Sequence, residues 1–208
     1  FFSSFFVIFL FNNDLINNNL ILFNDLTINL KNFIIPLSII TIIALSNSVN
    51  LTDGLDGLAA GCSSIVFCGL GTEILLKNDK NFLIFSILSF CMSGLCLGFL
   101  RHNKSPAKIF MGDTGSLTIG AIIGILCVVT NSFFTTFIIS GLFVVEALSV
   151  IIQVIYFKIT KKLFNKGKRF FLMTPIHHHF ELKGIKEQKI VEIFWSINIL
   201  LVIFSIVV

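Results

Sequence analysis

The stretch NSVNLTDGLDG, Asn47–Gly57, separates two apolar segments that we predict to be helices at 36–47 and 57–76. Two more polar clusters interrupt the apolar chain, NKSPAKIFMGDTGS at Asn103–Ser116 and MTPIHHHFELKG at Met173–Gly184. These clusters hold carboxylates, amides and three consecutive histidines, and each falls where an apolar segment ends. Counting the segments places all three on one face of a membrane, which favours an active site open to that side.

The composition is that of a membrane protein. The chain has 208 residues, of which 55% are hydrophobic and 12% are charged, whereas a soluble domain carries roughly 25% charged residues. Runs of about 20 apolar residues span the hydrocarbon core of a bilayer as helices. We therefore predict an all-α polytopic membrane protein, with residues 1–208 forming one transmembrane domain. The expected spanning helices are 36–47, 57–76, 82–100, 116–131, 133–157 and 190–208.

The first apolar run, Phe1–Phe11, is too short to span a bilayer. We expect it to be part of a helix whose upstream sequence is missing. The segment 12–35 is rich in asparagine, with imperfect alternation of isoleucine and leucine, and is expected to be an extracytoplasmic loop that can hold short strands.

The distribution of basic residues predicts the orientation. Three lie in the loop 101–112 and nine in the loop 158–189, which together make twelve of the fifteen in the chain. Cytoplasmic loops of membrane proteins are rich in lysine and arginine. We therefore expect both loops to be cytoplasmic, and 47–56 with them. The net charge of +4 needs no nucleic acid as a partner, because basic loops meet anionic lipid head groups.

Two acids in the first cluster are candidate catalytic groups. Asp53 and Asp56 are three residues apart, and a helix that began near Thr52 would place both on one face. At a helix end they avoid most of the cost of a charge inside the membrane. The alternative is capping by Asn50, Thr52 or Asp53. Capping explains one acid but not two acids with two asparagines, so we favour a functional role.

The second cluster places Asp113 between two glycines at the expected start of a helix. A helix start offers free amide groups to phosphate, which an acid at the same place would repel. A hard cation between them resolves the conflict, and Mg²⁺ prefers one or two carboxylates together with water and phosphate oxygens. The alternative is again a cap, formed by Asp113 or Thr114.

The third cluster holds His177, His178 and His179, with Glu181 two residues further on. Histidine suits proton transfer and phosphate binding near neutral pH. Zinc is the competing interpretation, but adjacent histidines point apart and no cysteine lies nearby.

Glu146 lies in the middle of the expected helix 133–157, where an acid is a functional candidate by default. Protonation, or pairing with Gln153 or with a polar group of another helix, is equally compatible with the sequence.

Four stretches together resemble the polyprenyl-phosphate sugar-1-phosphate transferase family. They are NSVNLTDGLDGLAAG (47–61), PAKIFMGDTGSLTIGA (106–121), GLFVVEALSVIIQV (141–154) and MTPIHHHFELKG (173–184). The first two are shared across the family, and the triple-histidine stretch resembles its phospho-N-acetylmuramoyl-pentapeptide transferase branch. That branch implies transfer of the phospho-sugar from UDP-N-acetylmuramoyl-pentapeptide to undecaprenyl phosphate, with release of UMP.

The resemblance also implies roles for individual residues. The catalytic residues would be Asp53, Asp56, His177 and His178. The substrate-binding residues would be Asn50, Gly54, Asn103, Phe110, His179 and Glu181. Mg²⁺ would be held by Asp113 with Asn47. The family also carries an adjacent aspartate pair on an upstream helix, which this chain does not contain.

The expected location is the bacterial inner membrane, with the site facing the cytoplasm, membrane lipids as partners and homodimerisation left open. Three other interpretations compete with this one. They are a sibling transferase that uses a UDP-N-acetylhexosamine, a channel or transporter, and an inactive membrane protein that retains the fold. A transporter would place its charges near the midplane rather than at one face.

Overall fold

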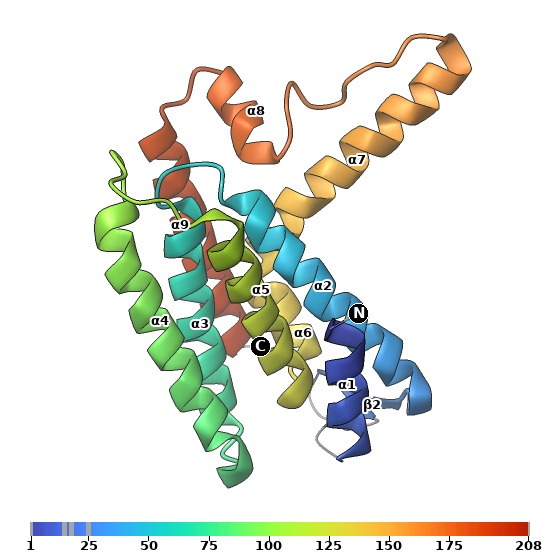
Figure 1. Ribbon diagram of the computed structural model, residues 1–208, viewed down its shortest axis with the longest axis vertical. Coiled ribbons are helices and arrows are strands. Elements are labelled where there is room, and N and C mark those ends of the chain that lie inside the picture. Colours follow the sequence, from blue (N-terminus) through green and yellow to red (C-terminus); the bar gives the residue numbers. More distant parts are fainter. Residues whose placement is uncertain (1, 14–15, 17–18, 24–25, 208) are drawn as a thin grey trace.

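A computed structural model of the chain describes residues 2–13, 16, 19–23 and 26–207. It is an all-α membrane protein, as predicted (Figure 1). The helices are α1 (Phe2–Asn12), α2 (Ile34–Thr52), α3 (Leu58–Leu76), α4 (Leu83–Asn103), α5 (Gly112–Val129), α6 (Phe133–Ile139), α7 (Gly141–Phe164), α8 (Ile176–Leu182) and α9 (Glu187–Val207). Six helical stretches within the described residues are long and apolar enough to cross a membrane.

A short hairpin lies in the segment where the sequence predicts strands. Strand β1 (Asn19–Phe23) pairs antiparallel with β2 (Leu26–Asn29), and Asn19 lies opposite Asn29. The side chain of Asn131, in the α5–α6 connection, donates a hydrogen bond to the carbonyl of Asn19 at 2.6 Å. The hairpin is therefore attached to the end of the bundle opposite the polar clusters.

Several predicted helix boundaries are wrong. The expected helix 133–157 is two helices, α6 and α7, which are separated at Ser140, and α7 continues to Phe164. The dipeptide Ser140–Gly141 marks the break as a turn signal, but apolar residues continue on both sides of it. The helix expected at 36–47 continues to Thr52, and Ser48 and Thr52 lie in it with their hydroxyls donating to the carbonyl four residues earlier. The helix expected at 116–131 already begins at Gly112.

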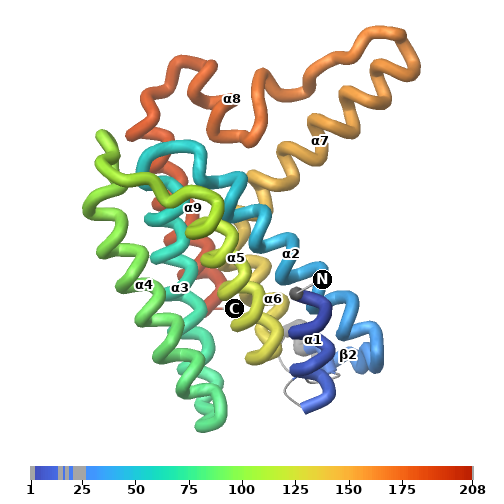
Figure 2. Tube along the Cα trace, viewed as in Figure 1, coloured from blue at the N-terminus to red at the C-terminus, as the bar shows by residue number. Residues whose placement is uncertain are grey.

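Helix α3 is the centre of the bundle and packs along α4 and α9 (Figure 2). Most of its residues are buried, on all sides of the helix. Ser64 of α3 and Ser93 of α4 exchange hydrogen bonds, with the Ser93 hydroxyl donating to the Ser64 carbonyl at 2.9 Å. Small and hydroxyl residues at such contacts let membrane helices approach closely.

Helices α2 and α5 also pack closely, and this contact positions the site. A Cβ atom at Gly120 would lie 2.6 Å from the Cα of Ser46, and one at Gly124 would lie 2.7 Å from the Cα of Ile42. The Ser46 hydroxyl donates to the carbonyl of Leu117 at 2.8 Å. The close approach brings the end of α2 beside the start of α5.

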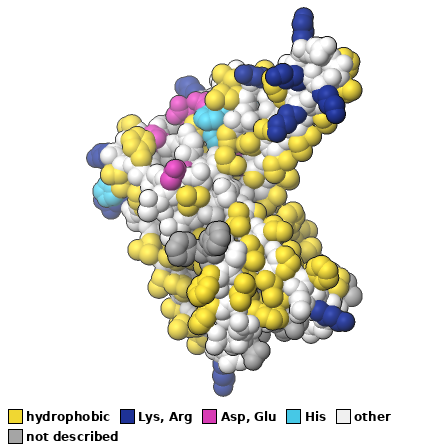
Figure 3. Space-filling view, turned by 45° about the vertical axis from the view of Figure 1, so that its right-hand side comes forward, with side chains coloured by type: hydrophobic (Ala, Val, Ile, Leu, Met, Phe, Trp, Pro, Cys, Tyr) yellow, Lys and Arg dark blue, Asp and Glu magenta, His cyan; other side chains and the backbone are white. Residues whose placement is uncertain are grey.

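Helix α7 leaves the bundle as a long arm, and α8 lies in the segment that returns from its tip to α9 (Figures 1 and 2). Helix α8 is a short helix inside the expected loop 158–189, which the sequence did not predict. Basic side chains gather at the tip of the arm, while acidic and histidine side chains gather nearer the bundle at the same end of the molecule (Figure 3).

Candidate active site

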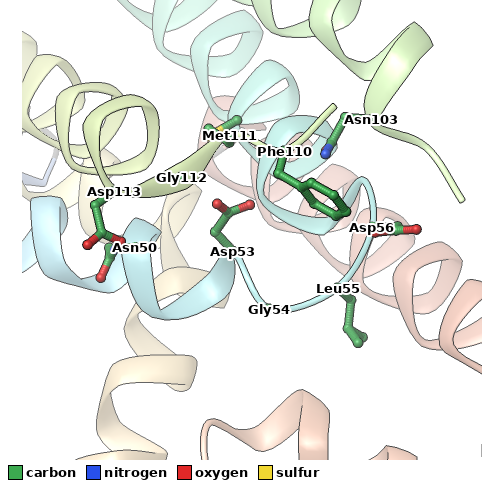
Figure 4. A pocket seen from close by; sticks show the side chains of 10 residues that line it. All are labelled: Asn50, Asp53, Gly54, Leu55, Asp56, Asn103, Phe110, Met111, Gly112 and Asp113. Atoms are coloured by element: carbon green, nitrogen blue, oxygen red, sulfur yellow. The ribbon is translucent and has the colours of Figure 1, made fainter. Parts of the chain in front are cut away.

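A pocket of about 320 Å³ lies between the α2–α3 turn and the α4–α5 loop (Figure 4). The first two polar clusters line it, and His177 of the third cluster lies against Gly54 without lining it. The lining residues are Asn50, Asp53, Gly54, Leu55, Asp56, Asn103, Phe110, Met111, Gly112 and Asp113.

The two acids of the first cluster lie in a turn and not on a helix face. A helix start near Thr52, which would place both acids on one face, is not found, because α2 ends at Thr52; α3 begins at Leu58, one residue after the start predicted for the helix 57–76. Gly57 precedes α3 with a φ of 79°, a left-handed conformation that favours glycine. The polar residues of this stretch therefore lie at a helix end, and capping of a helix start by Asn50, Thr52 or Asp53 does not occur.

Asp53 and Asp56 consequently have different surroundings. The Asp56 carboxylate accepts a hydrogen bond from the amide of Ala107 at 2.9 Å, which fastens the α4–α5 loop to the turn. The Asp53 carboxylate accepts from the amide of Gly112 and lies on the side of the pocket nearer Asp113 (Figure 4). Of the two acids, Asp53 has the placement for binding a cation.

The pKa of Asp53 is raised from the ordinary 3.8 to about 6. Partial burial is the main cause, the hydrogen bond from the Gly112 amide opposes it, and the negative charge of Asp113 adds to it. Two carboxylates that repel each other across a pocket are a favourable environment for a divalent cation, which would neutralise both.

Asp113 lies in the first turn of α5 and is exposed. Its Oδ1 accepts a hydrogen bond from Nδ2 of Asn50 at 2.9 Å, and the same Nδ2 donates to the Ser116 hydroxyl at 3.0 Å. No side chain caps α5 at Met111, so the capping alternative finds no support. Asn50 thus joins α2 to the acid that the sequence singles out as a metal ligand.

The ligand set fits Mg²⁺ better than a metal held by protein alone. Within the described ranges, no group of three His, Cys, Asp or Glu side chains is arranged to hold a metal ion. Mg²⁺ is commonly bound by one or two carboxylates, with water and substrate phosphates completing its shell, and Asp53 and Asp113 offer that. Asn47 lies one turn before Asn50 and outside the pocket lining, and its Nδ2 donates to the carbonyl of Ile43 at 2.8 Å.

Asn103 and Phe110 reach the pocket from the α4–α5 side. Asn103 is 3% exposed, its Oδ1 accepts from the amide of Gly57 at 3.1 Å, and its Nδ2 donates to the carbonyl of Ile109 at 2.9 Å. Its polar atoms therefore join both walls of the pocket. Phe110 is 78% exposed and presents an aromatic ring at the pocket (Figure 4).

The three histidines face different partners. His177 is fully buried, with Nδ1 3.1 Å from Oε1 of Glu146, and it lies against Gly54 without lining the pocket. His178 pairs with Glu181, with Nδ1 2.7 Å from Oε2. His179 accepts the amide of Leu172 at Nδ1, 3.1 Å away. Helix α8 therefore directs one histidine inward to the turn.

Glu146 is the residue whose partner sequence reasoning missed. It is fully buried and bonds His177 and the amide of Ile176, whereas Gln153 bonds the backbone of Phe170 and Phe171 instead. An acid within a membrane helix, together with a histidine-rich loop, was the available signal. The pairing itself depends on how α8 packs against α7.

The comparisons with known proteins identify the family of this chain. The family model described as glycosyl transferase family 4 matches residues 1–131. A phospho-N-acetylmuramoyl-pentapeptide-transferase of Prochlorococcus marinus subsp. pastoris (strain CCMP1986 / NIES-2087 / MED4) is 63% identical over 97% of this chain and 56% of the relative. A protein of the same name in P. marinus (strain NATL2A) is 47% identical over 99% of this chain and 55% of the relative. Another, in Synechococcus sp. (strain CC9605), is 46% identical over 83% of this chain and 49% of the relative.

The chain spans about half the length of the curated relatives it matches. The match to the family model covers α1 to the end of α5, and so includes both walls of the pocket. The chain belongs to glycosyl transferase family 4.

Proposed function

We propose that this chain carries the donor-binding pocket of a phospho-N-acetylmuramoyl-pentapeptide transferase. The enzyme would move the phospho-sugar from its UDP conjugate to undecaprenyl phosphate and release UMP. The observation that carries the proposal is the pocket in which Asn50, Asp53 and Asp113 gather at the start of α5, with the histidine helix α8 seated behind the same turn. The names of the relatives support this choice of substrates.

The pocket suits a nucleotide diphosphate. The exposed ring of Phe110 offers a flat apolar surface to a base, and the first turn of α5 offers backbone amides to phosphate oxygens. Asp53 and Asp113 would hold Mg²⁺. When bound, Mg²⁺ would neutralise the charge of the diphosphate.

Phosphoryl transfer depends mainly on positioning and on charge neutralisation. Exchange of one phosphoanhydride for another is close to neutral in free energy, so no further energy source is required. In this chain the positioning is done by Asn50, which fixes Asp113, and by the bond between Asp56 and Ala107, which fixes the wall that carries Phe110. His178 and His179 are half-buried, and these are the histidines of α8 that would be available to phosphate groups.

The proposed location is the bacterial inner membrane, with the pocket on the cytoplasmic side. The support is the placement of lysine and arginine at the end of the molecule that carries the pocket. A cysteine introduced at Lys166 should react with a membrane-impermeant thiol reagent in inverted vesicles and not in intact cells. Labelling in intact cells alone would reverse the orientation.

The function is tested by UMP release from membranes that contain undecaprenyl phosphate. The donors are UDP-N-acetylmuramoyl-pentapeptide and, in parallel, UDP-N-acetylglucosamine. Because the chain spans about half of its relatives, it is assayed alone and joined to the remaining part of the Prochlorococcus relative. We expect release from the muramoyl donor only, and none from Asp113→Asn. Release from the glucosamine donor alone would make the protein a sibling transferase, and release from neither would make it inactive.

A further inference from the structure

Glu146 and His177 form a buried pair that no part of the proposed chemistry uses directly. Both side chains are fully buried, and Oε1 of Glu146 lies 3.1 Å from Nδ1 of His177. The second carboxylate oxygen, Oε2, accepts the amide of Ile176 at 2.9 Å. Glu146 therefore holds both the ring of His177 and the backbone that leads into it, which fixes where the imidazole points.

The opposite edge of the imidazole faces the acid turn. Nε2 of His177 is buried and has no hydrogen-bond partner among the described residues. It lies against Gly54, where an added Cβ would be 2.9 Å from Cε1 and closer still to Nε2. Gly54 also lines the pocket. Gly54 is thus the single residue that separates the ring from the pocket, and Asp53 precedes it in the sequence.

We propose that Glu146 is a positioning residue that acts through His177 on the turn Asp53–Gly57, and so on the placement of Asp53 in the pocket. His177 then supports the turn by packing against it and does not touch substrate, in keeping with its complete burial. The inference rests on the proposed function only for the ligand that the pocket binds. The coupling of Glu146 to the turn is a property of the chain itself.

The magnitude follows from what such outer partners do elsewhere. Removing a carboxylate that orients a metal-bound histidine commonly weakens the site roughly 10- to 100-fold, and we take the same range for Glu146, which orients His177 in the same way. Glu146→Gln keeps the size of the side chain but loses the charge. Gly54→Ala disturbs the same contact from the other side, because its methyl group would enter the space of the imidazole. Two changes to one contact should not add their effects.

The chain supplies a matched control at the other end of the bundle. Glu73 is also buried, and it bonds Lys77 at 3.1 Å and the hydroxyls of Ser132 and Thr135. Glu73→Gln makes the same chemical change to a buried, paired acid far from the pocket. Any general effect on folding should appear in both variants, and an effect on the turn only in Glu146→Gln.

Two measurements on the full chain in membranes test the proposal. The first is the dissociation constant of UMP with Mg²⁺ present. The second needs no ligand and is the fluorescence of Trp195, the single tryptophan, whose ring packs against Gly61 and near Gly57. We expect Glu146→Gln and Gly54→Ala each to weaken UMP binding roughly 10- to 100-fold and to shift the emission. The double variant should be no worse than the weaker-binding single variant, and Glu73→Gln should leave both readouts unchanged.

Three results would overturn the proposal. The first is UMP binding by Glu146→Gln within twofold of the unmodified chain. The second is that the effects of Glu146→Gln and Gly54→Ala on UMP binding multiply in the double variant. The third is that Glu73→Gln changes both readouts as much as Glu146→Gln does. If Glu146→Gln does not fold, Gly54→Ala compared with Glu73→Gln decides by the same readouts. If the unmodified chain neither binds UMP nor releases it, the proposed function fails. The emission of Trp195 alone then decides whether Glu146 controls the turn.

Discussion

Replacing Asn103 by leucine should loosen both walls of the pocket at once. The substitution keeps a similar size and removes the acceptor of the Gly57 amide and the donor to the Ile109 carbonyl. A buried polar group left without a partner costs about 1–3 kcal/mol, whereas a group that water can reach loses only the net value of its bond, about 0.5–1.5 kcal/mol. The Gly57 amide is of the first kind and the Ile109 carbonyl of the second. We expect a loss of roughly 1.5–4.5 kcal/mol in the free energy of unfolding.

Denaturant unfolding in detergent, followed by circular dichroism, measures this loss. His102→Leu is the matched control, because His102 precedes Asn103 on the same helix turn and is exposed. Asn103→Asp should fall between the two, since it keeps an acceptor for Gly57 and loses the donor. UMP binding should be weakened least by His102→Leu, more by Asn103→Asp and most by Asn103→Leu. A variant Asn103→Leu as stable as His102→Leu would refute the reasoning that this side chain joins the walls.

Three further predictions concern the same region. Because the pKa of Asp53 is raised from 3.8 to about 6, the folded state holds this proton more tightly than the unfolded chain, and the stability it contributes is lost as the pH rises through 6. The unmodified chain should therefore gain thermal stability between pH 7 and pH 5 relative to Asp53→Asn, and equal gains would contradict the assignment. Phe110→Ala should leave the unfolding temperature unchanged, because the ring is 78% exposed, and should weaken UMP binding by about 1–3 kcal/mol, as measured by titration calorimetry. Gly120→Val should lower the free energy of unfolding by about 1–3 kcal/mol or more, because its Cβ would meet backbone atoms of α2 that cannot move aside; an unchanged denaturation midpoint would show that the helices can separate freely.

Much of the architecture could be predicted from the sequence because membrane spanning leaves strong signals. Length and apolar content locate the spanning helices, and the polar residues at the ends of these helices place the three clusters at one end of the molecule. These signals are set by the bilayer rather than by particular contacts. They need no knowledge of how one helix packs on another.

The predictions that were wrong or missing concern features that depend on tertiary contacts. The helix expected to end at Asn47 continues to Thr52, and the polar residues after Asn47 do not show where it stops. The break at Ser140 has only a short local signal, the dipeptide Ser140–Gly141, and apolar residues continue on both sides of it, so periodicity does not separate α6 from α7. The partner of Glu146 lies 31 residues away on a helix that the sequence did not predict.

The roles within the site also needed the structure. Asp53 and Asp56 are equivalent in the sequence pattern, yet the Ala107 amide binds one carboxylate and the Gly112 amide the other. Likewise, three adjacent histidines become one buried beside Glu146, one paired with Glu181 and one bound to backbone. Burial and distance distinguish residues that spacing alone leaves alike.

The most direct test of the account is the dependence of UMP release on Mg²⁺ concentration, in membranes with the muramoyl donor and undecaprenyl phosphate. The comparison is between the unmodified chain, completed by the remaining part of its relative, and Asp113→Asn. We predict release that rises and saturates with Mg²⁺ in the unmodified chain and is absent in Asp113→Asn at every concentration. Equal release by both, or release that does not depend on Mg²⁺, would contradict it.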